Sequence, residues 1–123
     1  MDFVFNDKLP IYIQIINYIK RKIVLLQICG GDKLPSIRDL SSELKINPNT
    51  VQRAYQELER EDLTYTKRGM GSFVTEDKNI IFKLKKDMAK EVIDKFVQEI
   101  KDLGFENEDI IRVVSEEVNK GDK

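Results

Sequence analysis

The chain has 123 residues, 41% of them hydrophobic and 35% charged, which allows one compact domain or a small domain with an appendage. It has no histidine and one cysteine, Cys29, which excludes an intrachain disulfide, a thiolate metal site and the commonest general base. The net charge of −1 divides into +2 over residues 1–75 (11 basic, 9 acidic) and −3 over residues 76–123 (10 basic, 13 acidic). This asymmetry is too weak to identify a partner.

The chain shows no signal for membrane insertion or export. No apolar run approaches the roughly 20 residues that a membrane span needs. The start, Met1-Asp2-Phe3, lacks the basic and apolar stretches of a signal peptide. We therefore expect a cytoplasmic protein without a membrane partner.

The first predicted helix covers about residues 10–28. Pro10 suits a first helical turn, and apolar residues then recur at helical spacing: Ile11, Ile15, Ile19, Ile23 and Leu26. The Gly30-Gly31-Asp32 turn is expected to end this helix. Cys29 lies among apolar neighbours, so we expect a small core side chain there rather than a redox switch.

Two helices joined by a tight turn are predicted next. Ser36 can cap the second helix, with Asp39 in a shortened capping box, and this helix ends near Lys45. The third helix opens with Asn47 as its N-cap and Pro48 in the first position, and extends to about Asp62. Only residues 45–47 separate the two helices, a spacing typical of a helix-turn-helix.

A hairpin and two further helices follow. The β-prone segments 63–68 and 72–75 flank Gly69-Met70-Gly71, which predicts a hairpin in the position of a wing. A long helix is expected from about Asn79 to a C-cap at Gly104. Asn107 is expected to cap a last helix. The predicted fold is mainly α: a winged helix-turn-helix over residues 1–76, then a two-helix hairpin over residues 77–123.

The third helix has the side chains of a DNA reader. On a helical wheel Asn49, Gln52 and Arg53 fall on one face and Val51, Ala54, Tyr55 and Leu58 on the opposite one. Asn and Gln pair with adenine and Arg with guanine, and readers lie near the N-terminal end of such a helix. No acidic residue lies between Asn47 and Gln56. A solvated amphipathic helix remains the alternative interpretation of this face.

Residues that flank the reading helix are candidates for phosphate contacts. They are Ser36 and Arg38 at the start of the second helix, Thr50 in the third helix, and Lys67 and Arg68 on the wing. Gly69 would let the wing backbone approach DNA closely, although a tight turn alone also explains it. With Asn47 and the three readers, these residues form the candidate DNA-binding set.

Several blocks of sequence match one known family in order over roughly residues 10–75. They are PIYIQI (10–15), GDKLPSIRDL (31–40), NPNTVQRAYQELE (47–59) and RGMGSFV (68–74). The chain resembles the GntR family of bacterial regulators, which implies a winged helix that binds operator DNA. The resemblance implies DNA contacts from Arg38, Asn49, Thr50, Gln52 and Arg68-Gly69. The chain departs from the family pattern at Pro48, where many members have arginine, and in the segment Cys29-Gly30-Gly31, where Lys-Pro-Gly is usual.

The short C-terminal region resembles that of the YtrA subfamily, which implies dimerisation and, for the whole chain, a repressor of transcription. A two-helix hairpin cannot bury its own apolar stripe, so a second copy of the chain is expected to cover it. The predicted dimer contacts are Leu84, Met88, Val92, Phe96, Ile100, Ile110, Ile111 and Val114. Packing on the chain's own winged helix is the alternative.

Two other functions are less well supported by the sequence. A winged helix used for protein–protein contact would bind no duplex in a salt-sensitive manner. An enzyme would need acid–base groups, for which Asp32, Asp39 and Glu43 are the only candidates, without a histidine or a phosphate loop beside them. We expect no catalytic residue, cofactor or metal, and the sequence identifies no small-molecule effector.

Overall fold

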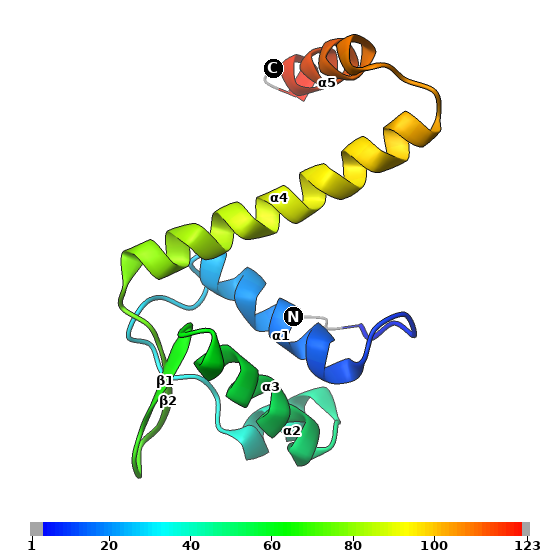
Figure 1. The fold of residues 1–123 in the computed structure, drawn as a ribbon. Helices are drawn as coiled ribbons and strands as arrows, with labels where there is room; N and C mark the ends of the chain where they lie inside the picture. Colours follow the sequence, from blue (N-terminus) through cyan, green and yellow to red (C-terminus); the bar gives the residue numbers. More distant parts are fainter. Residues whose placement is uncertain (1–3, 122–123) are drawn as a thin grey trace. The chain divides into compact units, whose positions relative to one another are not determined.

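The computed structural model describes residues 4–121, so the Met1-Asp2-Phe3 start lies outside it. In this part of the chain the elements follow in the order α1 (Ile11–Val24), α2 (Ile37–Leu44), α3 (Pro48–Arg60), β1 (Thr64–Lys67), β2 (Gly71–Val74), α4 (Lys78–Asp102) and α5 (Asn107–Gly121) (Figure 1). The predicted mainly helical fold with a hairpin wing is confirmed. The chain divides into two compact units between Lys85 and Lys86, inside α4.

The core of the first unit lies between α1 and α3. Ile15 and Ile23 of α1 and Val51 and Leu58 of α3 have no exposed surface, and the apolar face predicted for the third helix is buried. Each such aliphatic side chain contributes about 1.5–3 kcal/mol relative to exposure. Burial of this face fixes the opposite face of α3, with its amides and guanidinium, toward the surface.

Helices α2 and α3 begin where the capping residues predict. The Ser36 side chain accepts a hydrogen bond from the Asp39 backbone N–H at 3.0 Å, and the Asn47 side chain accepts one from the Asn49 N–H at 2.8 Å. Lys45 ends α2 in the left-handed conformation, with φ of 57°. The turn between the helices is therefore defined by local hydrogen bonds.

The end of α1 differs from the prediction. The helix ends at Val24 rather than near residue 28, before the Gly30-Gly31-Asp32 turn, because Leu26 adopts a left-handed conformation with φ of 59°. Backbone N–H groups of residues 27 and 28 bond back to the Lys22 carbonyl and close the helix. Leu26 is consequently 69% exposed instead of buried, and Cys29 lies exposed in the following turn instead of in the core.

The wing has a third, strand-like neighbour that was not predicted. The hairpin pairs Thr64 with Val74 through Lys67 with Gly71, antiparallel. Segment 31–34 then pairs with β2 through a bridge between Lys33 and Phe73, with backbone bonds of 2.8–2.9 Å. This segment connects the wing directly to the start of α2.

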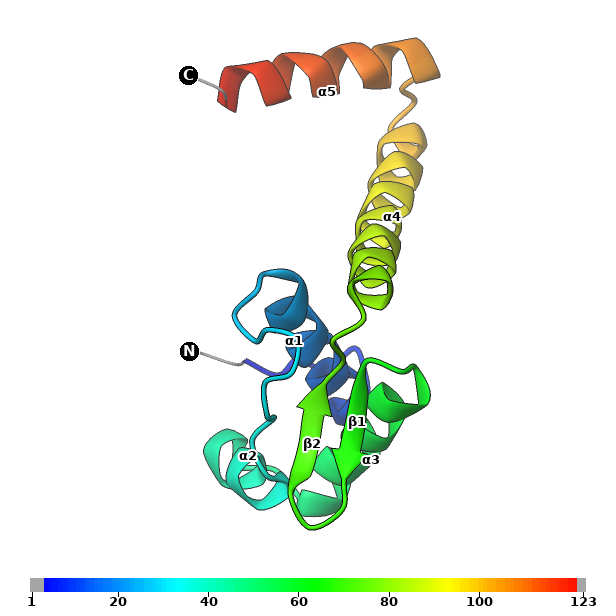
Figure 2. The same ribbon diagram turned by 90° about the vertical axis from the view of Figure 1, so that its left-hand side faces the viewer.

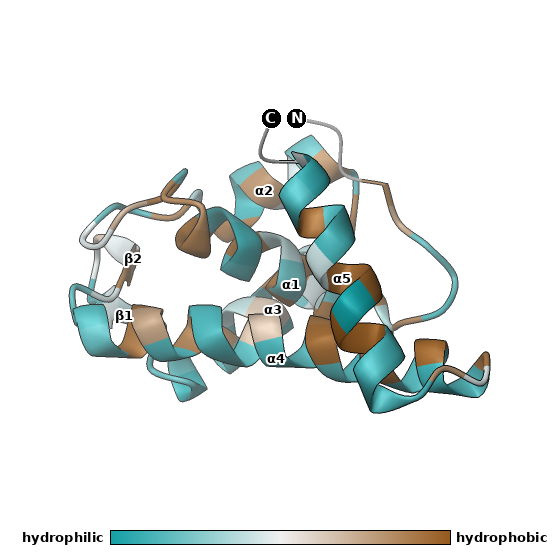
Figure 3. Ribbon diagram, turned by 90° about the horizontal axis from the view of Figure 1, so that it is seen from above, coloured by the Kyte–Doolittle hydropathy of each residue, from teal (hydrophilic) through white to brown (hydrophobic). Residues whose placement is uncertain are grey.

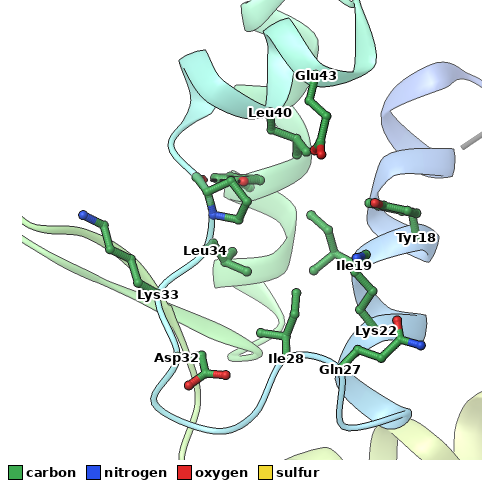
Figure 4. A pocket seen from close by; sticks show the side chains of 12 residues that line it. Tyr18, Ile19, Lys22, Gln27, Ile28, Asp32, Lys33, Leu34, Leu40 and Glu43 are labelled. Atoms are coloured by element: carbon green, nitrogen blue, oxygen red, sulfur yellow. Dashed lines mark hydrogen bonds between the residues drawn. The ribbon is translucent and has the colours of Figure 1, made fainter. Parts of the chain in front are cut away.

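Helix α2 packs on α3, and a cavity of about 660 Å³ separates it from α1. Figure 4 shows Glu43 and Leu40 of α2 facing Tyr18 and Ile19 of α1 across this cavity. The Tyr55 hydroxyl donates to the Pro35 carbonyl at 2.7 Å and so ties α3 to the residue just before the α2 cap. Burial, with a smaller effect of Glu43, raises the pKa of Tyr55, so this hydroxyl remains a donor. The position of α2 therefore depends on α3.

The second unit comprises the rest of α4 and all of α5. Asn107 is the first residue of α5 rather than its cap, and the Glu106 N–H before it donates to the Asp109 carboxylate at 3.2 Å. Apolar residues recur along the exposed surface of both helices (Figure 3), among them Val92, Phe96, Ile111 and Val118. Over residues 4–121, none of the helices combines the length and apolarity needed to cross a bilayer.

Candidate nucleic-acid interface

The candidate site comprises the exposed face of α3, the start of α2 and the wing turn. Figures 1 and 2 show α2 and the tip of the hairpin at the same end of the first unit. All ten predicted DNA-binding residues are exposed except Thr50, which is half-buried. The fold thus brings three separate segments of the predicted set to one surface.

The first turn of α3 is electropositive without a basic residue in it. The helix dipole favours an anion at this end, although the backbone N–H groups of Asn49, Thr50 and Val51 already bond to Asn47. Helix α3 has no acidic residue in its first turn, and Pro48 occupies its first position. A phosphate approaching this turn would meet no carboxylate on α3.

The two capping side chains keep donors available. Ser36 and Asn47 both use an oxygen as acceptor for the cap. The hydroxyl proton of Ser36 and the amide NH₂ of Asn47 are then donors that the cap does not consume. Both residues are exposed, so each can cap its helix and donate to a phosphate.

Substitution of Asn47 separates these two roles. Asn47→Asp is expected to retain the cap, leaving the free energy of unfolding within about 0.5 kcal/mol, because aspartate caps helices as well as asparagine does. Asn47→Ala is expected to lower it by about 1 kcal/mol. The aspartate should nevertheless weaken DNA binding, since it removes two donors and adds a negative charge. Denaturant unfolding of both variants measures the free energy of unfolding, and titration with a duplex measures DNA affinity. If Asn47→Asp bound DNA as tightly as the wild type, Asn47 would not belong to the site.

On the wing, the three predicted residues have different surroundings. The Lys67 ammonium lies 4.8 Å from the centre of the Phe73 ring, and that ring stacks with Tyr65 at 5.8 Å. Arg68 and Gly69 form the turn itself, closed by the Met70 N–H bonding to the Lys67 carbonyl at 2.9 Å. Gly69 has φ of 77°, a conformation that favours glycine, and a Cβ there would meet nothing within 4 Å. The turn requires this glycine, and the space around it is open.

Polar contacts within the protein fix the far end of α3. Glu59 accepts a hydrogen bond from the Thr66 hydroxyl at 2.6 Å, which ties the wing to α3. Lys20 of α1 pairs with Glu61 at 2.9 Å, and Arg60 contacts Glu57. These carboxylates are thus engaged with partners within the protein.

Tyr12 of α1 is a functional candidate that the sequence did not single out. The Arg53 guanidinium carbon lies 3.8 Å from the centre of the Tyr12 ring, so the predicted reader Arg53 stacks on another helix. Cation–π pairs of this kind form between residues far apart in sequence. In the sequence, the signal that could have found Tyr12 is its place in the opening block PIYIQI.

A short helix, a tight turn, a second helix with a polar exposed face and a hairpin define a winged helix-turn-helix protein. The model of the family "Bacterial regulatory proteins, gntR family" matches residues 11–74. The chain belongs to the GntR family. It is a DNA-binding transcription regulator of that family and not an enzyme.

Similar proteins share this assignment over most of the chain. An uncharacterized HTH-type transcriptional regulator of Bacillus subtilis, YhcF, is 40% identical over 90% of this chain and 92% of its own length. The HTH-type transcriptional repressor YtrA of the same organism is 38% identical over 93% of this chain and 91% of its own. Both matches extend past the wing into the C-terminal helices.

Solved structures agree with these matches. A GntR family transcriptional regulator from Listeria monocytogenes superposes with a TM-score of 0.85 at 46% identity, covering 91% of this chain and 98% of that one. The DNA-binding domain of AraR, solved in complex with operator ORX1, superposes with a TM-score of 0.57 at 25% identity over 61% of this chain and 96% of that one.

Proposed function

We propose that the protein binds a palindromic operator as a homodimer and represses transcription. The observation that carries this proposal is the exposed N-terminal face of α3, which presents amides and a guanidinium without an acid while its opposite face is buried in the core. Residues 1–76 would serve as the DNA-binding region and residues 77–123 as the dimerisation region. A regulator of chromosomal genes works beside the chromosome, so we also propose a cytoplasmic location.

On DNA, α3 would enter the major groove with Asn49 and Gln52 toward base edges. Ser36, Arg38, Asn47 and Thr50 would contact phosphates on either side of the groove. The wing turn at Arg68-Gly69 would approach the neighbouring backbone or minor groove. The DNA-binding domain of AraR has a similar fold and was solved in complex with an operator, which supports operator binding by this fold.

The dimer would form through the apolar surface of the C-terminal helices. Of the predicted contacts, Val92 is 69% exposed and Ile111 67% exposed, whereas Leu84 and Ile110 are already buried within the single chain. Apolar side chains in such a series mark an interaction surface. A symmetric second copy would cover the same residues on both chains and present two reading helices to half-sites about 10 base pairs apart, or a multiple of that.

Repression is proposed from the similarity to YtrA, which is described as a repressor and matches the chain over nearly its whole length. A bound dimer would block the polymerase wherever its operator overlaps a promoter. The alternative is a winged helix that docks only on proteins. The absence of acidic residues from the N-terminal exposed face of α3 favours DNA over this alternative.

Repeated selection from randomised duplexes tests the proposal. Purified protein should enrich an inverted repeat, and titration should give two protomers per duplex. Gln52→Ala should relax the preference at one base pair of each half-site by about 1–3 kcal/mol, whereas Gln98→Ala on α4 should not. Failure to enrich any sequence, together with the absence of salt-dependent duplex binding, would contradict the proposal.

A further inference from the structure

The pair formed by Tyr12 and Arg53 joins the start of α1 to the reading helix. The guanidinium carbon lies 3.8 Å from the ring centre, well inside the range of a cation–π contact. Tyr12 is half-buried while Arg53 is exposed. The ring is therefore a platform fixed by the fold, and the arginine that rests on it faces solvent.

The helix offers Arg53 an ion pair that it does not make. Glu57 stands four residues later, the spacing of a helical salt bridge, yet its carboxylate contacts Arg60. Among residues 4–121 no hydrogen bond or ion pair of the Arg53 guanidinium is found. Stacking uses the flat face of the group and leaves the N–H donors along its edge for an external acceptor.

Contact with a ring of another helix also changes where Arg53 points. Tyr12 holds the guanidinium beside α1, whereas Asn49 and Gln52 carry no such tether. A base edge lies deep in the groove in front of α3, while the phosphate backbone runs along its flank. The held position suits a phosphate oxygen better than the guanine edge that the sequence predicted.

We propose that Tyr12 is a positioning residue that holds Arg53 as a phosphate anchor on the α1 side of the reading helix. This inference rests on the proposed DNA-binding role of α3. Tyr12 itself need not touch DNA. The ring restricts the long arginine side chain before binding, so less conformational entropy is lost when the phosphate contact forms.

The test uses the full-length protein, its selected operator and a scrambled duplex of equal length, titrated over a range of salt concentrations. Tyr12→Leu should weaken binding to both duplexes by about two- to thirtyfold for each protomer, the range expected when one cation–π interaction is removed. Tyr12→Phe keeps the ring and should bind as wild type does. Tyr18→Leu is the matched control, because it removes another ring of α1 that lies near a lysine but outside the candidate site.

Arg53→Met keeps an aliphatic stem on the ring and removes the charge, so it tests the anchor even if Tyr12→Leu does not fold. This variant should weaken binding to both duplexes equally. The slope of log K against the logarithm of the salt concentration should become shallower by about 0.9 for each phosphate that the protein no longer neutralises. Tyr12→Leu added to Arg53→Met should cause no further weakening, because the platform acts only through the arginine.

Three results would overturn the proposal. If Tyr12→Phe bound DNA as poorly as Tyr12→Leu, the effect of Tyr12 would come from its hydroxyl and not from stacking of its ring on Arg53. If the Arg53→Met variant no longer preferred the operator over the scrambled duplex, Arg53 would be a base reader rather than a phosphate anchor. Additive effects in the double variant would show that the two residues act independently. Failure of the proposed function is distinguishable from all three, because the wild-type protein would then bind neither duplex.

Discussion

Arg38→Ala is expected to reduce operator affinity by at least about 100-fold. Arg38 is the second residue of α2, is exposed, and follows the Ser36 cap. A charge-assisted hydrogen bond contributes about 1.5–3 kcal/mol, and the substitution removes one such bond from each protomer of a symmetric dimer, which amounts to about 3–6 kcal/mol. At about 1.4 kcal/mol per tenfold this corresponds to about 10²–10⁴ in affinity. Fluorescence titration of the operator at one fixed salt concentration measures it.

Arg112→Ala is the matched control for this prediction. Arg112 is an exposed arginine on α5, where it pairs with Asp109 at 3.4 Å, and it lies outside the candidate site. Its removal should leave DNA affinity within about twofold, since exposed ion pairs contribute little. An unfolding transition unchanged in both variants would show that α2 remains folded. Equal affinities of Arg38→Ala and Arg112→Ala would remove Arg38 from the interface.

Val92→Asp is expected to convert the dimer into monomers and, through that, to weaken operator binding strongly. Val92 is 69% exposed in the single chain, so the substitution should change the stability of a monomer by no more than about 0.5 kcal/mol. In a symmetric apolar interface two carboxylates would be buried without partners, and each costs at least several kcal/mol. Sedimentation equilibrium measures the change in mass, and the same samples serve for DNA titration.

Asn119→Asp provides the matched charge change on the other C-terminal helix. It also adds one negative charge at an exposed position, but to a residue that is already polar. This variant should stay dimeric and bind DNA normally. If Val92→Asp were also dimeric, the exposed surface of α4 would not be the interface. A monomeric wild-type protein would contradict the dimer itself.

The sequence determined those features that depend on neighbouring residues. Capping of α2 by Ser36 and of α3 by Asn47 involves hydrogen bonds to residues two or three positions away. The two faces of α3 follow from helical periodicity, and the wing turn follows from Gly69 with its positive φ. Each of these was predictable because the interacting groups lie within one helical turn or one β-turn of each other.

Only the tertiary structure decided the features that join distant segments. One local feature was also not predictable: Leu26 adopts a left-handed conformation that its residue type does not favour, so α1 ends early and Cys29 is exposed. Segment 31–34 becomes a neighbour of β2, and Arg53 reaches Tyr12, through contacts between residues far apart in the chain. Such contacts depend on how the helices pack together, which residue periodicity within each helix does not specify.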